Sequence, residues 1–309
     1  MLSLKQSIIQ EVHLNELKDR NIQFYVKRDD LIHPEISGNK WRKLKYSILH
    51  AEQQKFEGIL TFGGAYSNHL VATAAACQLN NLRSIGIVRG EELTIVSNET
   101  LMRCAEYGME LHFVSRSDYS LRNEKMYQEE LTSLFPSMYI VPEGGANYLG
   151  IIGCSEILAE TSNDFDIVVV AQGTTTTSAG VLLSLPEDST LWVVPVLKGF
   201  NSLAEMKALF TYSAFESETV KDWLSKIEIL NEYHFGGYGK YNTELIDFIE
   251  SFYIETGIPL DPVYTGKSMF ALLKEIQKQD LRNKRILFIH TGGLQGAKSI
   301  FEKEKRVIF

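Results

Sequence analysis

Runs of residues typical of buried β-strands alternate with longer helical runs along most of this chain, from about residue 56 onward. The strand-like runs are residues 58–62, 84–88, 110–114, 166–171, 191–195 and 285–290. The helical runs expected between the first of them are residues 70–79, 99–107 and 121–134. Strands that alternate with helices form βαβ units, whose crossovers produce a mainly parallel sheet covered by helices on both faces. The sequence therefore predicts an α/β fold.

Length, charge and hydropathy exclude several classes of protein. A chain of 309 residues is long enough for one large domain or for two. The net charge of −8, with no basic block longer than residues 40–45, argues against nucleic acid as the main partner. The longest apolar runs have the length of a strand and cannot span a membrane. The first residues lack the pattern of a secretory signal, so we expect a cytoplasmic protein with a small-molecule partner.

The three cysteines, Cys77, Cys104 and Cys154, lie far apart in the sequence and form no C-x-x-C pair. An odd and sparse set is typical of reduced thiols rather than of a disulfide framework or a metal site. We expect all three to lie in the core, since free cysteine is among the most buried residue types.

Four loops rich in Gly, Ser, Thr and Asn are candidates for ligand binding. In an open α/β sheet, ligands bind beyond the carboxyl ends of the strands, where loops lead into helix N-termini. That rule selects residues 63–69, 143–147, 173–178 and 290–293. Each of these loops can present backbone N–H groups to a ligand.

Two familiar phosphate-binding signatures are not present. No G-x-G-x-x-G follows a strand-like run, so a Rossmann dinucleotide site is not supported. Gly266-Lys267-Ser268 resembles the end of a Walker A loop, but Asp261 replaces the first glycine of that motif and Pro262 falls inside the loop. The sequence therefore argues against ATP hydrolysis.

A threonine-rich segment is better placed to bind a phosphate. This segment, the threonine loop, lies between the strand-like run 166–171 and an expected helix at 180–185 and consists of Gly173, Thr174, Thr175, Thr176 and Thr177. Backbone N–H groups, hydroxyls and the positive end of a helix dipole together suit a phosphate monoester. The same residues suit a simple helix N-cap, because Ser and Thr favour that position. The loop alone leaves both interpretations open.

The segment around Lys40 reads Ser37-Gly38-Asn39-Lys40-Trp41-Arg42-Lys43-Leu44. By itself, Lys40 is one cation in a basic turn. The segment closely resembles, however, the S-G-N-K-x-R-K-L stretch of pyridoxal-5′-phosphate (PLP) enzymes of the tryptophan synthase β type. It is most similar to the branch that holds 1-aminocyclopropane-1-carboxylate (ACC) deaminase and D-cysteine desulfhydrase. In that branch, the lysine at the position of Lys40 forms a Schiff base with PLP.

Four further segments match the same family in the same order. They are Lys27-Arg28-Asp29-Asp30, Gly63-Gly64-Ala65-Tyr66-Ser67-Asn68-His69, Asp261-Pro262-Val263-Tyr264-Thr265-Gly266-Lys267-Ser268 and His290-Thr291-Gly292-Gly293. The resemblance spans from about residue 20 to about residue 296 and so covers nearly the whole chain. Tyr66 stands where the family has Gln, and Leu70-Val71-Ala72 runs where the family has Arg-Gln. The threonine loop has fewer glycines than usual and the chain is somewhat short, and these departures concern the substrate more than the cofactor.

The resemblance implies roles for the residues around the cofactor. Lys40 would hold PLP and then remove the α-proton of the substrate, since the pKa of a lysine next to a cationic imine is lowered. Lys43, about one helical turn later, would pair with the phosphate, which the threonine loop would cradle. Asn68 would donate a hydrogen bond to the phenolic oxygen of PLP.

The resemblance also implies a substrate site at the start of a helix. Ser67, Asn68 and His69 would receive the substrate carboxylate, where N–H groups and the helix dipole favour an anion. The serine at this position can also shuttle a proton in the family. Tyr264 and Tyr238 match two active-site tyrosines of the family, although tyrosine is also common at the edge of a core.

Thr265 bears most directly on the reaction. It occupies the family position that faces the pyridine nitrogen of PLP, where a carboxylate would keep the nitrogen protonated and strengthen the electron sink. A threonine cannot do this, which favours prompt loss of a β-leaving group. ACC deaminases have Glu and Leu at the positions of Thr265 and Thr291, whereas desulfhydrase-like members have Ser or Thr and Thr. We therefore expect a PLP-dependent β-eliminating lyase similar to D-cysteine desulfhydrase, which forms pyruvate, ammonia and sulfide from D-cysteine.

Three alternatives stay open at this point. They are an ACC deaminase-like enzyme, a non-catalytic PLP-binding or sensor protein, and β-elimination or deamination of another amino acid, which Tyr66 and Leu70 allow. The resemblance further implies a two-domain fold, the tryptophan synthase β-like fold (PLP fold type II). Residues 1–45 and 151–309 would form the large PLP-binding domain and residues 46–150 the small α/β domain. A homodimer is the family expectation.

Overall fold

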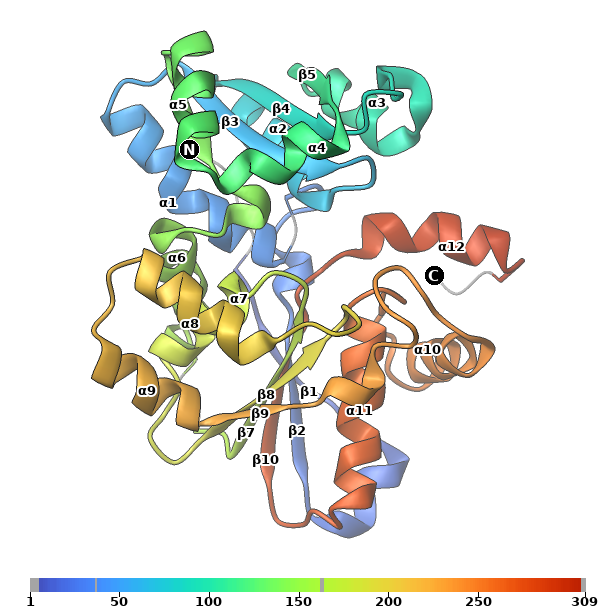
Figure 1. Ribbon diagram of the computed structural model, residues 1–309. Helices are drawn as coiled ribbons and strands as arrows, with labels where there is room; N and C mark the ends of the chain where they lie inside the picture. Colours follow the sequence, from blue (N-terminus) through green and yellow to red (C-terminus); the bar gives the residue numbers. More distant parts are fainter. Residues whose placement is uncertain (1–5, 37, 162–163, 307–309) are drawn as a thin grey trace. The chain divides into compact units, whose positions relative to one another are not determined.

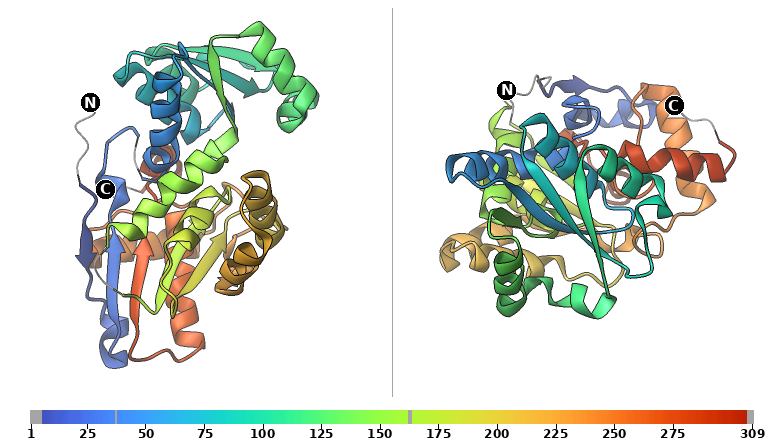
Figure 2. Two further views of the ribbon diagram at one scale, coloured as in Figure 1. Left: turned by 90° about the vertical axis from the view of Figure 1, so that its left-hand side faces the viewer. Right: turned by 90° about the horizontal axis from the view of Figure 1, so that it is seen from above.

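The computed structural model describes residues 6–36, 38–161 and 164–306, so Ser37 of the lysine segment lies outside the described residues. The chain divides into two compact units, which Figures 1 and 2 show as ribbons. Unit 1 contains Pro34–Ile36 and Lys40–Gly153. Unit 2 contains the described parts of Lys5–His33, Ser37–Asn39 and Cys154–Phe309. Each unit has its own sheet and its own helices.

Unit 1 is built on a four-stranded sheet in the order β5-β4-β3-β6, in which every neighbouring pair of strands is parallel. The strands are β3 (Gly58–Gly64), β4 (Arg83–Arg89), β5 (Met109–Val114) and β6 (Met138–Val141). The helices are α1 (Asn39–Gln53), α2 (Asn68–Leu79), α3 (Glu99–Glu106), α4 (Arg116–Ser120) and α5 (Lys125–Leu134). Helix α6 (Tyr148–Ala159) contains the boundary with unit 2.

Both faces of this sheet are covered, because successive side chains of a strand point to opposite faces. Ile59 packs in one apolar cluster with residues of α1 and α2, while Val88 packs with residues of α2 and α3. Leu60 and Ile85 face the other way and pack with Tyr119 of α4 and a leucine of α5. Helices α1, α2 and α3 therefore cover one face, and α4 and α5 cover the other (Figure 1).

Unit 2 is built on a six-stranded sheet in the order β1-β2-β10-β7-β8-β9. The strands are β1 (Ile9–Glu11), β2 (Gln23–Lys27), β7 (Ile167–Gln172), β8 (Thr190–Pro195), β9 (Ile227–Ile229) and β10 (Arg285–Ile289). Only the pair β1–β2 is antiparallel within the described residues. All six residues of the inner strand β7 are buried, as expected for a parallel strand with helices on both sides.

The helices of unit 2 form two groups around this sheet. The helices are α7 (Thr176–Leu183), α8 (Ser202–Tyr212), α9 (Ser217–Ser225), α10 (Thr243–Thr256), α11 (Thr265–Lys278) and α12 (Ala297–Lys303). Residues of α10, α11 and α12 share one large apolar cluster with Val169, Trp192 and Phe288 of the sheet. Helices α8 and α9 lie on the opposite side of the sheet from α10 and α11 (Figure 1).

The predicted α/β fold with mainly parallel strands is confirmed, and all three cysteines are buried as expected. The single helix expected over residues 121–134 is wrong. The backbone is extended at Glu124 (φ −76°, ψ 134°), and α5 begins only at Lys125. The break lets Tyr119 and Leu131 both reach the same apolar cluster. None of the described helices is long and apolar enough to cross a membrane.

Candidate functional site

Lys40 and Lys43 lie in the first turns of α1, so their side chains leave the helix about one turn apart. Lys43 is buried and Lys40 is half-buried. Gly145 packs directly against Lys43, since a Cβ added to this glycine would lie 2.9 Å from Lys43 Cβ. Gly145 also has a φ of +70°, which favours glycine. The loop 143–147, one of the four predicted ligand loops, therefore lies beside the lysine helix within unit 1.

His69 is buried next to the same two lysines. Its Nε2 lies 3.0 Å from Thr61 Oγ1, and that hydroxyl donates to the Val141 carbonyl at 2.8 Å. Because the hydroxyl proton is used, Nε2 must carry the imidazole proton and donate it to Thr61. Burial, together with the charges of Lys40 and Lys43, lowers the pKa of His69 to about 3. The imidazole is therefore neutral at neutral pH, and its buried Nδ1 has no hydrogen-bond partner among the described residues.

Ser67 and Asn68 stand at the start of α2, as the sequence predicts. Ser67 is the N-cap, and its Oγ accepts a hydrogen bond of 3.3 Å from the Leu70 N–H. Gly63 makes this turn possible, since a Cβ there would lie 2.7 Å from Ser67 Oγ and 2.6 Å from Leu70 Cγ. Ser67 Oγ uses a lone pair for the cap and keeps its proton as a donor.

Two of the departures from the family pattern have different surroundings. Tyr66 is 71% exposed, so its side chain is accessible to a ligand or to solvent. Leu70 is completely buried in a cluster with Val88, Leu101 and Met109. An arginine in that place would bring a charge into an apolar core, so the leucine belongs to the packing of unit 1.

Gly38 and Asn39 belong to unit 2 and contact two of its loops. The Asn39 side-chain amide donates to Thr177 Oγ1 at 2.8 Å, and the Asn39 N–H donates to the Thr291 carbonyl at 3.2 Å. Gly38 has a φ of +62°, and a Cβ there would lie 1.9 Å from the Thr291 carbonyl oxygen. The residue bonded to Lys40 is thus held by the threonine loop and by the H-T-G-G segment.

The threonine loop is shorter than predicted, because α7 already begins at Thr176 and not at residue 180. The Thr175 carbonyl accepts the first helical hydrogen bond, from the Ala179 N–H at 2.9 Å. Thr176 Oγ1 is buried and has no hydrogen-bond partner among the described residues. A buried hydroxyl without a partner is costly unless a ligand satisfies it.

Gly173, Tyr264 and Tyr238 lie together in unit 2. A Cβ on Gly173 would be 2.9 Å from Tyr264 Cε1 and 3.4 Å from its hydroxyl oxygen, so only glycine allows the ring to approach. The Tyr264 ring meets the Tyr238 ring edge to face, with centroids 6.0 Å apart. Tyr238 is 51% exposed. The two predicted tyrosines are therefore neighbours at the start of the threonine loop.

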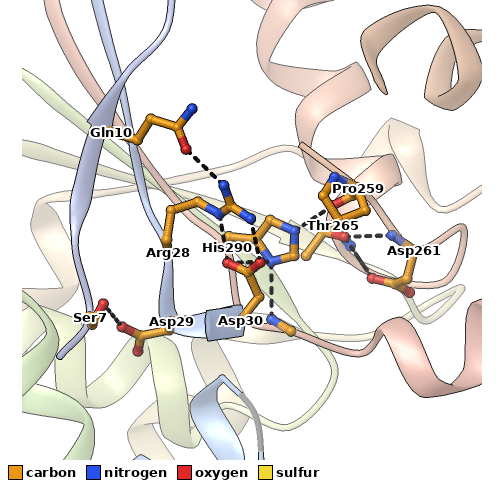
Figure 3. A network of polar contacts seen from close by, with 10 residues as sticks. Ser7, Gln10, Arg28, Asp29, Asp30, Pro259, Asp261, Thr265 and His290 are labelled. Atoms are coloured by element: carbon orange, nitrogen blue, oxygen red, sulfur yellow. Dashed lines mark hydrogen bonds and ion pairs between the residues drawn. The ribbon is translucent and has the colours of Figure 1, made fainter. Parts of the chain in front are cut away.

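Thr265 is completely buried, whereas Thr291 is 6% exposed. The Thr265 hydroxyl forms hydrogen bonds with Asp261. Thr265 Oγ1 donates to Asp261 Oδ1 at 2.7 Å and accepts from the Asp261 N–H at 2.9 Å (Figure 3). The Asp261 carboxylate also accepts the N–H groups of residues 263, 264 and 265, each at 2.8 Å. Burial raises the pKa of Asp261, and these hydrogen bonds oppose the shift only in part. The carboxylate caps the start of α11.

Three residues of the matching segments had no predicted role and form one buried network in unit 2 (Figure 3). Arg28 forms two hydrogen bonds with the Asp30 carboxylate, at 2.9 and 2.8 Å. His290 Nδ1 lies 3.6 Å from Asp30 Oδ1 and accepts from the Gly292 N–H at 3.2 Å. His290 Nε2 therefore donates to the Pro259 carbonyl, at 2.6 Å. The network fixes the loops before Thr265 and around Thr291. The only sequence signal for it was that Arg28, Asp30 and His290 lie in the ordered motif blocks.

The predicted site residues thus fall into two groups of contacts, one in each unit. In unit 1, Lys40, Lys43 and His69 lie together next to the loop of Gly145. In unit 2, the threonine loop contacts Tyr264 and the Asn39 side chain, while Thr265 is enclosed by Asp261.

Comparisons with known proteins show the family of the chain. The family model described as "Pyridoxal-phosphate dependent enzyme" matches residues 8–292. A putative ACC deaminase of Pyrococcus furiosus is 34% identical, over 88% of this chain and 85% of its own length. A D-cysteine desulfhydrase of Yersinia pestis is 32% identical, over 88% of this chain and 86% of its own length. A crystal structure described as an ACC deaminase homologue has a TM-score of 0.79 and 28% identity, covering 97% of this chain and 93% of the other.

Proposed function

Because the chain belongs to the pyridoxal-phosphate dependent enzyme family, we propose that it is a β-eliminating lyase that converts D-cysteine to pyruvate, ammonia and sulfide. The observation that carries this proposal is the uncharged character of Thr265 and Thr291. The carboxylate closest in sequence, Asp261, accepts four hydrogen bonds from residues 263–265 and is not available as a partner for the pyridine nitrogen.

The residues present fit PLP. The buried Thr176 hydroxyl without a partner and the N-terminus of α7 suit a phosphate group. We propose that the threonine loop (Gly173, Thr174, Thr175, Thr176 and Thr177) and Lys43 bind the phosphate, that Asn68 binds the phenolic oxygen, and that Lys40 holds the cofactor through Nζ. When bound, PLP supplies an electron sink for the bonds at the substrate α-carbon.

The side chains of this chain would then bind the substrate and move its protons. Ser67 and Asn68 would bind the carboxylate at the start of α2, and His69 would contribute through its backbone, because its imidazole is buried and neutral. Lys40 Nζ would remove the α-proton. Tyr264 and Tyr238, whose rings touch, are proposed as the catalytic phenols.

Deamination of ACC is the second candidate, and the names of the P. furiosus relative and of the crystal structure favour it. Both reactions end in a 2-oxo acid and ammonia, so the choice of substrate decides between them. A non-catalytic PLP-binding protein would retain the cofactor and release no 2-oxo acid from any substrate.

The test is to purify the protein, record its visible absorption and measure 2-oxo acid release. The substrates are D-cysteine, L-cysteine, D-serine, β-chloro-D-alanine and ACC. We expect a PLP absorption band in the wild type and in the control Lys45→Ala, and its loss in Lys40→Ala. We expect release from D-cysteine. Survival of the band in Lys40→Ala would contradict the cofactor assignment, and release from ACC but not from D-cysteine would reverse the choice of substrate.

A further inference from the structure

The loop that carries Tyr238 has a backbone rich in left-handed residues. Four of its residues have left-handed φ values, namely Phe235 (54°), Gly236 (95°), Gly237 (122°) and Gly239 (66°). A run of glycines in this region costs conformational entropy on folding. The loop connects a 3-10 turn at Asn231–Tyr233 to α10, with no helix or strand between them. Contacts from elsewhere in unit 2 would add to the hydrogen bonds of its own turns.

Lys267, on the first turn of α11, supplies such a contact. Its side chain is completely buried, and Nζ donates to the His234 carbonyl at 2.9 Å and to the Gly237 carbonyl at 2.8 Å. The same two carbonyls also accept from the N–H groups of Gly237 and Lys240, at 3.0 and 3.1 Å. The ammonium thus lies where two successive turns of the loop present their carbonyls.

The ammonium is a costly group to bury, which argues for a specific use. Burial lowers the pKa of Lys267 to about 8, and the charge of Asp261 opposes this only in part. A buried cation is tolerated when its N–H groups form hydrogen bonds, and here Nζ donates to two backbone carbonyls. An apolar residue could fill the same volume without this cost.

This loop has one ring contact at its beginning and one at Tyr238. Phe235 packs edge to face on Phe270 of α11, with ring centroids 5.2 Å apart, and so fixes the beginning of the loop. Tyr238 is half exposed, and its described ring contact is with Tyr264. Gly237, whose carbonyl Lys267 binds, is the residue bonded to Tyr238.

We propose that Lys267 is a positioning residue, whose ammonium holds the loop 234–240 on α11 and so fixes Tyr238 beside Tyr264. Helix α11 then begins directly after its N-cap, Tyr264, and its residue Lys267 binds the loop that carries Tyr238. The inference rests on the proposed function, in which these two tyrosines act on the substrate. It gives the lysine of the D-P-V-Y-T-G-K segment a role unrelated to phosphate.

The first test measures hydrogen exchange of the backbone amides by mass spectrometry, with and without PLP. The variant is Lys267→Met, and the matched control is Lys274→Met, which removes an exposed lysine from the same helix. We expect exchange in residues 234–240 to become at least about tenfold faster in Lys267→Met only, because hydrogen bonds to a charged donor are among the stronger ones. Unchanged exchange in this segment would overturn the proposal.

The second test separates positioning from general destabilisation by a double-mutant cycle with Tyr238→Phe. We expect Lys267→Met to keep the PLP absorption band and to lower kcat/KM, and the double variant to be no worse than the poorer single variant. Losses that multiply in the double variant would show that Lys267 does not act through Tyr238 and would overturn the proposal.

Lys267→Gln, which keeps a neutral donor, replaces Lys267→Met in both tests if the methionine variant does not fold. The exchange measurement needs no turnover. A wild type that releases no 2-oxo acid would therefore contradict the proposed function, while the exchange of residues 234–240 would still decide whether Lys267 holds the loop.

Discussion

Replacing Gly38 by alanine tests the turn that precedes Lys40. Gly38 has a φ of +62°, and a Cβ there would lie 1.9 Å from the Thr291 carbonyl oxygen and 2.7 Å from the Gly292 nitrogen. Ordinary contact begins at 3.4 Å, so the backbone on one side must move by more than an ångström. The movement would also disturb the hydrogen bond from the Asn39 N–H to the Thr291 carbonyl.

The left-handed backbone costs alanine about 1–2 kcal/mol. The clash adds about 1–3 kcal/mol, as for overpacking in a core, and one weakened buried hydrogen bond adds about 1 kcal/mol. We therefore expect Gly38→Ala to lower the free energy of unfolding of the protein without cofactor by about 3–6 kcal/mol. A displacement of this size next to Lys40 should also lower kcat/KM about a hundredfold.

Urea denaturation gives the free energy, and Gly257→Ala is the matched control. Gly257 ends α10 with a φ of +69° and has nothing within 4 Å of an added Cβ, so it carries the backbone cost without the clash. We expect the control to lose only about 1–2 kcal/mol. Equal losses in the two variants would refute the close approach of Gly38 to Thr291.

Three further predictions concern single side chains. The pKa of His69 falls from 6.5 to about 3 on folding, so between these pH values the unfolded chain binds a proton that the folded chain does not. The free energy of unfolding should therefore decrease as the pH falls below 6.5, by up to about 1.4 kcal/mol per pH unit. Urea denaturation of His69→Gln should show a weaker dependence on pH over the same range. Asp261→Ala leaves the N–H groups of residues 263–265, which lead into α11, without their acceptor and should lower the free energy of unfolding by at least about 2 kcal/mol in the same assay. An unchanged free energy would contradict the capping role. Gly173→Ala would place a methyl group 2.9 Å from Tyr264 Cε1. The Tyr264 ring can shift to avoid it, so we expect a clear fall in 2-oxo acid release with little change in the melting temperature.

The inner strands could be predicted from sequence because a parallel strand covered on both faces is a continuous apolar run. Strand β7 (Ile167–Gln172) illustrates this. Strands β1, β2, β6 and β9 were not predicted. β1 and β9 have three residues each, and β2 pairs with β10 from the other end of the chain, so no local pattern defines them.

The site could be predicted as a set of residues but not as a set of contacts. Motif order selected Thr265, whereas only coordinates show that its hydroxyl is enclosed by Asp261. His69 was expected to meet the substrate, yet its imidazole is turned into the core of unit 1 toward Thr61. The division into residues 1–45 with 151–309 and 46–150, the homodimer and the cytoplasmic location stay predictions.

The order of strands in unit 2 has a consequence for synthesis on the ribosome. β10 lies between β2 and β7, so the strand that is made after all the other described strands separates two that are made much earlier. Residues 40–153 of unit 1 are contiguous, and their four strands can pair while translation continues. β2 must instead wait, with an unpaired edge toward β10, until residue 289 has emerged. The nascent chain therefore carries an open sheet until β10 is made, and a chain truncated before β10 would be prone to aggregate.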